Sequence, residues 1–258
     1  MYKLVFVRHG ESEFNKKNIF AGFVNSDLSP KGEEESRRAG QVLKKKGFAF
    51  DCAFTSVLER NIKTLNIILD EMDLMWIPVT KHWALNERHY GDLEGRSKKL
   101  MAKKFGEEQV FQWRRGYRVR PPEITPKNKY YKIENLYYKP IIEVMNKKKL
   151  PLAESLYDVY QRTVPYWKEQ IAPAIKKGKN VLIVSHGNSI RSIIKYLDKI
   201  SDDKISALDI PTGIPLVYEL NRRLKPIRHY YLASEKDVKA AINKVKNQGK
   251  IDKKKKKK

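Results

Sequence analysis

The sequence predicts an α/β fold, a single domain in which a mainly parallel central sheet has helices on both faces. Two β-branched apolar runs, at 4–7 and 181–184, are typical of buried parallel strands. A strand–helix–strand pattern from Asp51 to Ile77 predicts the crossover that joins parallel neighbours. With 258 residues, the chain is long enough to bury a sizeable core.

Local signals place the remaining elements. Ser29 is a good N-cap and Pro30 suits the first helical position, so we expect a helix from Pro30 to about Lys46 that stops at Gly47. Periodicity predicts the other elements, which are a strand at 52–55, a helix through 58–69, a strand at 77–80, helices near 97–104 and 106–115, a helix over 154–171, an amphipathic helix after 189, an antiparallel pair at 214–220 and 226–231, and a helix at 235–247.

One catalytic domain is expected to cover residues 1–232. Within it, residues 116–153 show no clear period and contain several prolines, so we interpret them as a long insertion or lid. Residues 233–258 are predicted to hold a C-terminal helix and a basic, disordered tail, because Lys253–Lys258 is an uninterrupted charged run.

Composition limits the classes of function. Cys52 is the only cysteine, which excludes an intramolecular disulfide and a cysteine-based metal site. We expect a cytoplasmic protein, because there is no signal-peptide pattern and no apolar stretch near the roughly 20 residues of a membrane span. A net charge of +24 fits a field that attracts polyanionic metabolites, or binding of nucleic acid or an acidic surface through the basic tail.

Arg8, His9 and Gly10 follow the first apolar run, at the point where the chain is expected to turn. Ligands bind at the carboxyl ends of strands in open α/β sheets. Arg8 can hold phosphoryl oxygens there with two N–H bonds, while His9 attacks phosphorus through a ring nitrogen. The motif therefore predicts a phosphate-handling nucleophile.

A second histidine, His186, follows the run at 181–184 and comes just before an amphipathic helix. Free backbone N–H groups and the helix dipole favour an anion at such a place. Two histidines at the ends of adjacent parallel strands predict two imidazoles around one anion-binding pocket. The alternative is a pair of ordinary buried histidines bonded to backbone.

Further groups suit the same pocket. Arg60 comes early in the helix after the 52–55 strand and can point back over the sheet edge. Arg114 and Arg115 add charge, although neighbouring arginines commonly divide into one salt bridge and one solvent-facing side chain. Glu87 would be repelled by a phosphate, so it needs a chemical role, either general acid–base transfer or a local salt bridge. Neutral donors for phosphate oxygens are Ser12, Asn15 and Asn188.

These motifs resemble the histidine phosphatase superfamily and, within it, the 2,3-bisphosphoglycerate-dependent phosphoglycerate mutases. The similarity covers about residues 3–120 and 151–232. The segments that carry it are 8–12 (RHGES), 28–32 (LSPKG), 85–91 (LNERHYG), 113–115 (WRR), 154–156 (ESL), 185–189 (SHGNS) and 210–220 (IPTGIPLVYEL). The resemblance implies a phosphoglycerate mutase-like fold and a homodimer.

The same resemblance implies a glycolytic enzyme that interconverts 3-phosphoglycerate and 2-phosphoglycerate through a phosphohistidine, primed by 2,3-bisphosphoglycerate and without a metal. By this resemblance His9 is the phosphorylated nucleophile, His186 its partner and Glu87 the proton donor and acceptor. Arg8 and Arg60 would hold the transferring phosphate. The residues implied in substrate binding are Ser12, Asn15, Gly22, Tyr90, Lys98, Arg114, Arg115, Gly187 and Asn188.

The sequence departs from the family pattern at several positions. Ala21 stands where a small hydroxyl or thiol residue is usual, and Phe23 replaces the usual tryptophan. Ser97 replaces a common asparagine and Glu59 a common lysine, while residues 121–150 match poorly. These departures concern affinity and the lid, because each catalytic group is present.

Three other functions compete with the mutase. A bisphosphoglycerate synthase is disfavoured because Ser12 and Gly22 match the mutase branch. A broad phosphatase is disfavoured by Lys98, Arg114 and Arg115, which suit a second anionic group. A catalytically inactive protein that binds RNA or acidic membrane is disfavoured because the histidines, the arginines and a carboxylate are all present.

Overall fold

The computed structural model describes residues 1–140, 150–248 and 250. Its centre is a six-stranded sheet in the order β3-β2-β4-β1-β5-β6. The strands are β1 (Tyr2–Arg8), β2 (Cys52–Thr55), β3 (Val79–Lys81), β4 (Val181–Ser185), β5 (Leu216–Leu220) and β6 (Pro226–Tyr231). Pairing is parallel among β3, β2, β4 and β1, and antiparallel from β1 to β5 and from β5 to β6. The predicted mainly parallel sheet is confirmed.

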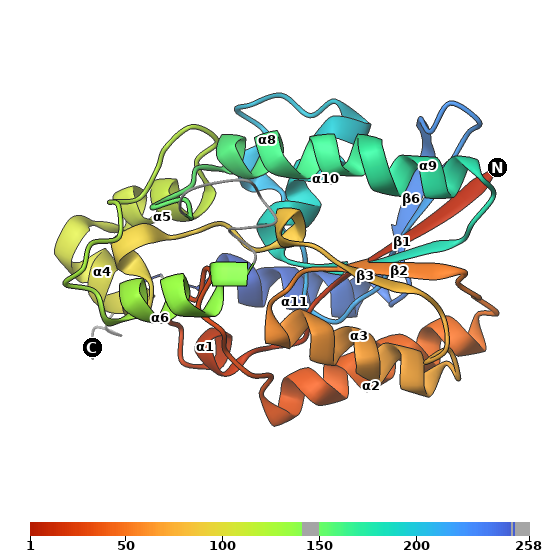
Figure 1. Ribbon diagram of the computed structural model, residues 1–258, viewed down its shortest axis with the longest axis horizontal. Coiled ribbons are helices and arrows are strands. Elements are labelled where there is room, and N and C mark those ends of the chain that lie inside the picture. Colours follow the sequence, from red (N-terminus) through yellow and green to blue (C-terminus); the bar gives the residue numbers. More distant parts are fainter. Residues whose placement is uncertain (141–149, 249, 251–258) are drawn as a thin grey trace, which may run out of the picture.

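Helices cover both faces of the sheet, as the sequence predicts (Figure 1). One face carries α2 (Pro30–Lys45) and α3 (Glu59–Glu71), and the other carries α8 (Leu156–Tyr166), α9 (Ala172–Lys176) and α10 (Gly187–Asp198). The Ser29 side chain accepts a hydrogen bond from the Gly32 N–H at 3.1 Å, so it caps α2 as expected.

Strand β1 shows why the central strands are apolar throughout. Leu4 and Phe6 pack in one cluster with residues of α8 to α10, whereas Val5 and Val7 pack in another with residues of α2 and α3. Side chains alternate between the faces of a strand, and here both faces are covered. An uninterrupted apolar run is therefore the pattern that this position requires.

The remaining helices gather mainly beyond one end of the sheet, opposite the N-terminus (Figure 1). They are α1 (Glu13–Lys16), α4 (Lys98–Phe105), α5 (Glu107–Arg115), α6 (Lys129–Tyr137) and α11 (Glu235–Lys246). Short turns of other helix types are η1 (Trp83–Leu85), η2 (Gly91–Leu93), η3 (Trp167–Ile171) and η4 (Ile205–Ala207). In the described ranges, no helix is both long and apolar enough to cross a membrane.

Several boundaries differ from the prediction. The 77–80 strand begins at Val79, after Pro78, which cannot donate a ladder hydrogen bond. The helix expected over 154–171 begins after Ser155, whose side chain caps it, and a π-helical turn follows α8. Helix α6 lies inside the insertion at 116–153 and was not predicted, because its apolar residues keep no clear period. Parts of the predicted lid (141–149) and tail (251–258) lie outside the described residues.

Two backbone segments meet closely where β1 ends. A Cβ on Gly10 would lie 2.1 Å from the Gly32 oxygen, and a Cβ on Gly32 would lie 2.0 Å from the Glu11 oxygen. Both partners are backbone atoms, so neither can rotate away. Glycine at these positions therefore lets the first turn of α2 pack directly under the loop after β1.

We expect Gly10→Ala to lower the free energy of unfolding by about 1–3 kcal/mol, because the methyl group forces the two segments apart. Urea denaturation followed by circular dichroism measures this change. Gly187→Ala is the matched control, because its Cβ would lie 3.5 Å or more from its nearest neighbours, which are atoms of Arg8. Equal midpoints for the two variants would contradict the steric argument.

Candidate active site

The sheet brings the two predicted histidines together. Arg8 pairs with Ser185 in the register of the parallel strands β1 and β4, so the next residue of each strand, His9 and His186, lies at the same edge. Their ring centroids are 4.9 Å apart and the ring planes meet at 64°. Both side chains are buried. The two imidazole rings therefore lie side by side, but only His9 is among the residues that line the pocket.

The hydrogen bond of His9 shows which ring nitrogen is free to react. Nδ1 lies 2.7 Å from the carbonyl oxygen of Gly10, which can only accept, so Nδ1 carries the proton and Nε2 keeps its lone pair. Burial holds the pKa of His9 well below its usual range, and Arg60 and Arg8 lower it further. The ring is therefore neutral at neutral pH and can attack through Nε2.

A serine hydroxyl contacts one ring nitrogen of His186. Its Nε2 lies 3.0 Å from Ser56 Oγ, which also accepts the Leu58 N–H. Ser56 can donate its proton to Nε2, which leaves the ring proton on Nδ1, an atom without a hydrogen-bond partner in the described part of the chain. Burial, Arg60 and His9 lower the pKa of His186. Nδ1–H is thus available as a neutral donor to a phosphoryl oxygen.

Two buried arginines stand beside the histidines. Arg8 donates Nη1 to the Ile210 carbonyl at 2.8 Å, while its buried Nε has no partner among the described residues. Arg60 donates to the carbonyls of Gly22 (2.8 Å) and Val24 (2.9 Å). Burial lowers the pKa of both guanidinium groups. Arg60 therefore supplies charge and also fixes the loop that lines the pocket.

Glu87 enters the same pocket from the loop after η1. Its Oε1 accepts from Asn188 Nδ2 at 2.6 Å and from the Arg88 N–H at 2.8 Å. The same Asn188 amide contacts the Tyr90 hydroxyl at 3.1 Å. Within the described residues, amide groups hold this carboxylate and no arginine forms a salt bridge with it.

Arg162 of α8 fixes the Glu87 loop and was not predicted from the sequence. It donates to Glu154 at 2.7 and 2.9 Å and to the carbonyls of Ala84 and Glu87, both at 2.8 Å. Nothing in the sequence pattern of α8 distinguishes this arginine from one on a solvent-facing surface. Only the fold shows that it is a positioning residue.

A second group of cations forms the other side of the pocket. Lys98 and Arg114 both contact Gln248, through Lys98 Nζ to Oε1 at 3.1 Å and through the guanidinium to the carbonyl. Burial and Arg114 hold the pKa of Lys98 well below its usual value, and burial and Arg115 lower the pKa of Arg114 to about 10. These neighbouring positive charges lower one another's pKa, and a bound anion would relieve their repulsion.

Arg115 lies at the pocket and Ser12 lies outside its lining, and both side chains have partners within the protein. Arg115 borders the pocket but also forms an ion pair with Asp209 and donates to the Leu208 carbonyl at 3.1 Å. The Ser12 hydroxyl accepts the Asn15 N–H at 3.2 Å and caps α1, and Ser12 is not among the pocket-lining residues. The predicted residues that line the pocket are Arg8, His9, Asn15, Gly22, Arg60, Glu87, Tyr90, Lys98, Arg114, Arg115, Gly187 and Asn188.

Arg191 also lines the pocket and was missed. It lies one helical turn after Asn188 and donates to the oxygen of that side chain, while its Nη1 is buried without a partner in the described ranges. Spacing of three residues on the predicted helix was the signal that could have found it.

The sequence matches the histidine phosphatase superfamily (branch 1) over residues 4–135 and 133–225. The chain belongs to this superfamily. Solved structures with the same fold include a mycobacterial glucosyl-3-phosphoglycerate phosphatase, with a TM-score of 0.67, 20% identity and coverage of 91% of this chain and 99% of the other. The α-ribazole phosphatase from Shigella flexneri gives a TM-score of 0.63, 20% identity and coverage of 88% and 94%.

At this level of identity the neighbours establish the fold alone. They match nearly their whole length, so the phosphoglycerate mutase-like architecture expected from the sequence is confirmed. The superfamily assignment supports an enzyme that handles phosphoryl groups. The named neighbours are phosphatases, and the choice between mutase and phosphatase depends on the pocket.

Proposed function

We propose that this enzyme is a cytoplasmic, 2,3-bisphosphoglycerate-dependent phosphoglycerate mutase of glycolysis, with no metal requirement. The observation that supports it is the charge of the pocket. Among the described residues, six cationic side chains line it, against two carboxylates, Glu87 and Asp209. The cations are Arg8, Arg60, Lys98, Arg114, Arg115 and Arg191. A substrate with two phosphates and a carboxylate would balance this charge, whereas a monophosphate would need only the arginines beside His9.

The described geometry suits the mutase reaction. Nε2 of His9 attacks phosphorus, the bond from phosphorus to the glycerate oxygen breaks, and Glu87 gives that oxygen a proton. In the return step the substrate hydroxyl passes its proton to Glu87, and its oxygen takes the phosphoryl group from His9. A loose transition state spreads charge over the phosphoryl oxygens, which Arg8 and Arg60 can stabilise.

The C-terminal region contributes to the pocket wall. Val245 of α11 and Gln248, two residues after that helix, line the pocket. Lys244 of α11 forms an ion pair with Glu11, which lies in the loop after β1. Exclusion of water protects a phosphohistidine from hydrolysis. A mutase needs this protection, whereas a phosphatase must admit water.

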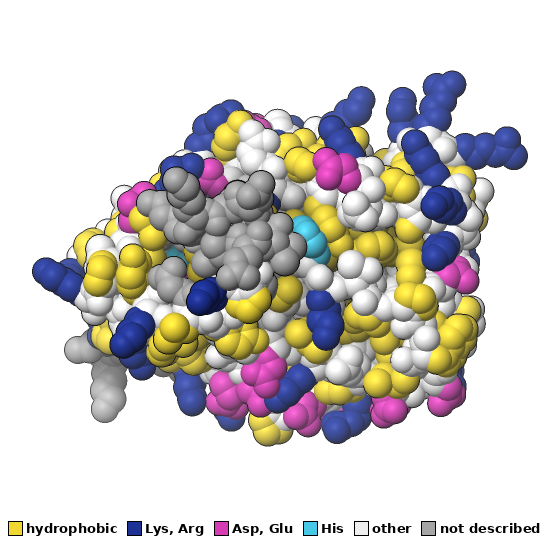
Figure 2. Space-filling view, viewed as in Figure 1, with side chains coloured by type: hydrophobic (Ala, Val, Ile, Leu, Met, Phe, Trp, Pro, Cys, Tyr) yellow, Lys and Arg dark blue, Asp and Glu magenta, His cyan; other side chains and the backbone are white. Residues whose placement is uncertain are grey.

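A binder of nucleic acid finds less support. Figure 2 shows Lys and Arg side chains scattered over the visible face, with hydrophobic and neutral side chains between them and no continuous basic stripe. Recognition of a single strand combines a basic groove with interleaved aromatic side chains. Binding through the basic tail and homodimer formation remain predictions.

A coupled assay tests the proposed activity. We expect conversion of 3-phosphoglycerate to 2-phosphoglycerate to be strongly stimulated by trace 2,3-bisphosphoglycerate and to persist in a chelator. Phosphate release is measured in the same samples. Release of phosphate without isomerisation would instead make the enzyme a phosphatase.

Lys98→Met should separate recognition of the second anion from chemistry at His9. We expect the KM for 3-phosphoglycerate to rise roughly 10–100-fold, because a hydrogen-bonded charge is lost. Slow hydrolysis of a small aryl phosphate should change less than about twofold, because its single phosphate needs only the arginines near His9. Lys103→Met, an exposed residue of the same helix, is the control. Equal losses on both substrates would contradict the assignment.

A further inference from the structure

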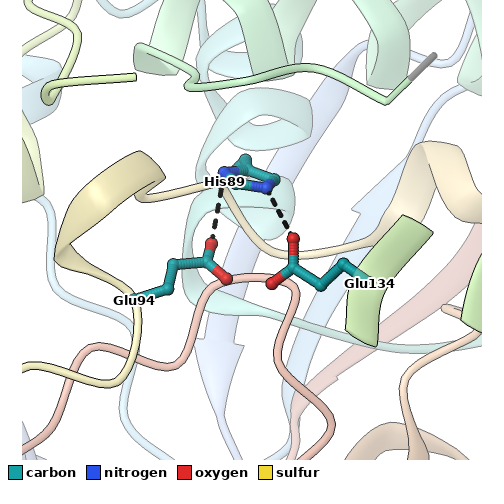
Figure 3. Close-up of side chains that lie close together, drawn as sticks. All are labelled: His89, Glu94 and Glu134. Carbon is teal, nitrogen blue, oxygen red and sulfur yellow. Dashed lines mark hydrogen bonds and ion pairs between the residues drawn. The ribbon is translucent and has the colours of Figure 1, made fainter. Parts of the chain in front are cut away.

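Three buried titratable side chains form a cluster outside the pocket lining (Figure 3). His89 and Glu94 belong to the loop region after Glu87, whereas Glu134 belongs to α6 of the insertion. Their exposed fractions are only 1%, 1% and 3%. The cluster therefore joins the insertion to the segment that carries the acid–base residue.

The hydrogen bonds of His89 use both ring nitrogens. Nδ1 accepts the Gly91 N–H at 3.0 Å, so Nδ1 carries no proton. Nε2 must then carry it and donates to Glu134 Oε2 at 2.9 Å. Both ring nitrogens are thus engaged, and Nδ1 also lies 3.3 Å from Glu94 Oε1, so no lone pair of the ring is free to bind a metal ion.

The hydrogen bonds of Glu94 lead back to the active site. Its Oε1 accepts the Tyr90 N–H at 2.8 Å and the Phe23 N–H at 3.1 Å. Tyr90 and Gly22, the neighbour of Phe23, both line the pocket. A Cβ on Gly22 would lie 1.8 Å from Glu94 Oε1, which shows how closely this loop packs on the carboxyl group. Glu94 therefore fixes two segments that line the site, the one at Gly22 and the one at Tyr90.

One oxygen of each carboxyl group accepts no N–H or O–H hydrogen bond from the rest of the described chain. These atoms are Glu94 Oε2 and Glu134 Oε1, and both are buried. In Figure 3 these two oxygens face each other. Two carboxylates cannot both remain charged so close together in a water-excluded place, and one proton between them converts repulsion into a hydrogen bond.

We propose that Glu94 is a positioning residue whose protonated carboxyl donates from Oε2 to Glu134 Oε1 and so fixes α6 and the Gly22 and Tyr90 walls in one arrangement. Its effect on kinetics rests on the proposed function, whereas the shared proton does not. A sequence motif could not reveal it, because Glu134 lies in the segment without clear period.

The electrostatics agree with this placement of the proton. Burial and the charge of Glu134 raise the pKa of Glu94 well above its usual value, whereas hydrogen bonds from His89 and Glu94 lower that of Glu134. Among the described residues, the other charged or titratable side chains near the pair are Arg60 of α3, Tyr138 at the end of α6, and the Glu154–Arg162 ion pair next to His89.

The sign of the pH dependence follows. The folded protein holds the Glu94 proton more tightly than the unfolded chain, so the contact is intact below the raised pKa of Glu94 and is lost as the pH rises through it. Loss of the proton restores repulsion between the carboxylates and loosens the pocket walls. We expect the KM for 3-phosphoglycerate to rise on the alkaline side.

The test compares Glu94→Gln with Glu94→Ala. The glutamine amide can donate to Glu134 while its oxygen still accepts from Phe23 and Tyr90, so its KM should stay within about twofold of the original and lose the alkaline rise. Alanine should raise the KM about tenfold with a smaller effect on kcat. Glu123→Ala, an exposed carboxylate of the insertion, is the control. A glutamine variant as impaired as alanine would overturn the proposal.

A second measurement needs no substrate. Infrared spectra at neutral pH should show the C=O band of a buried protonated carboxyl, absent from Glu94→Gln, and amide exchange in α6 should speed up only in Glu94→Ala. If that band is missing, or if a stoichiometric divalent metal is found whose removal reproduces the alanine variant, the shared proton is wrong. These outcomes are independent of whether the enzyme is a mutase, because neither readout requires turnover.

Discussion

Replacing His9 with alanine is expected to abolish both phosphoryl transfer and formation of the phosphoenzyme. The proton on Nδ1 leaves Nε2 as the attacking atom, and the lowered pKa keeps this atom unprotonated at neutral pH. We expect turnover to fall by roughly 10⁶-fold, a loss of the size seen when a catalytic nucleophile is deleted. Radioactive labelling from 2,3-bisphosphoglycerate and the coupled assay measure the two effects.

A second histidine provides the control for this variant. His82 is half-buried and stacks on Tyr166 at 4.1 Å between ring centroids, away from the pocket. His82→Ala should keep labelling and most of the turnover, even where stability falls. Substantial labelling of His9→Ala would move the nucleophile to another residue, and His186 would be the first candidate because its ring lies beside His9.

The elements that were predicted correctly from the sequence are those whose local residue pattern favours the same structure as their packing in the fold. The apolar run at 4–7 and the cap at Ser29 each have one good structural solution, and the structure adopts it. Strand-end placement also brought His9 and His186 together correctly, because parallel strands in register end at the same edge.

The remaining parts depend on contacts that no local pattern encodes. Arg162 and Ser56 act through residues far away in sequence, so their roles appear only when the loop of Glu87 and the ring of His186 are placed. The carboxyl pair is the extreme case. Glu94 and Glu134 look like ordinary surface acids in sequence, and only burial against each other gives them a function.

The second large effect is expected at Glu87. Glu87→Gln keeps an oxygen that can accept from Asn188 and from the Arg88 N–H, so the geometry of the loop should survive. The amide cannot take up or return a proton at the substrate oxygen. We therefore expect turnover to fall by about 10²–10⁴-fold while a phosphoenzyme still forms slowly.

Rapid-quench measurement of phosphoenzyme formation, alongside steady-state turnover, separates proton transfer from binding. A loss of acid–base catalysis slows the step that makes or breaks the bond to the glycerate oxygen and leaves the KM within a few-fold of the original value. Glu108→Gln, an exposed residue of α5, controls for the change of charge. If Glu87→Gln turned over as fast as the unaltered enzyme, the proton would have to travel through another group, and Tyr90, whose hydroxyl shares the Asn188 amide with Glu87, stands nearest to that role.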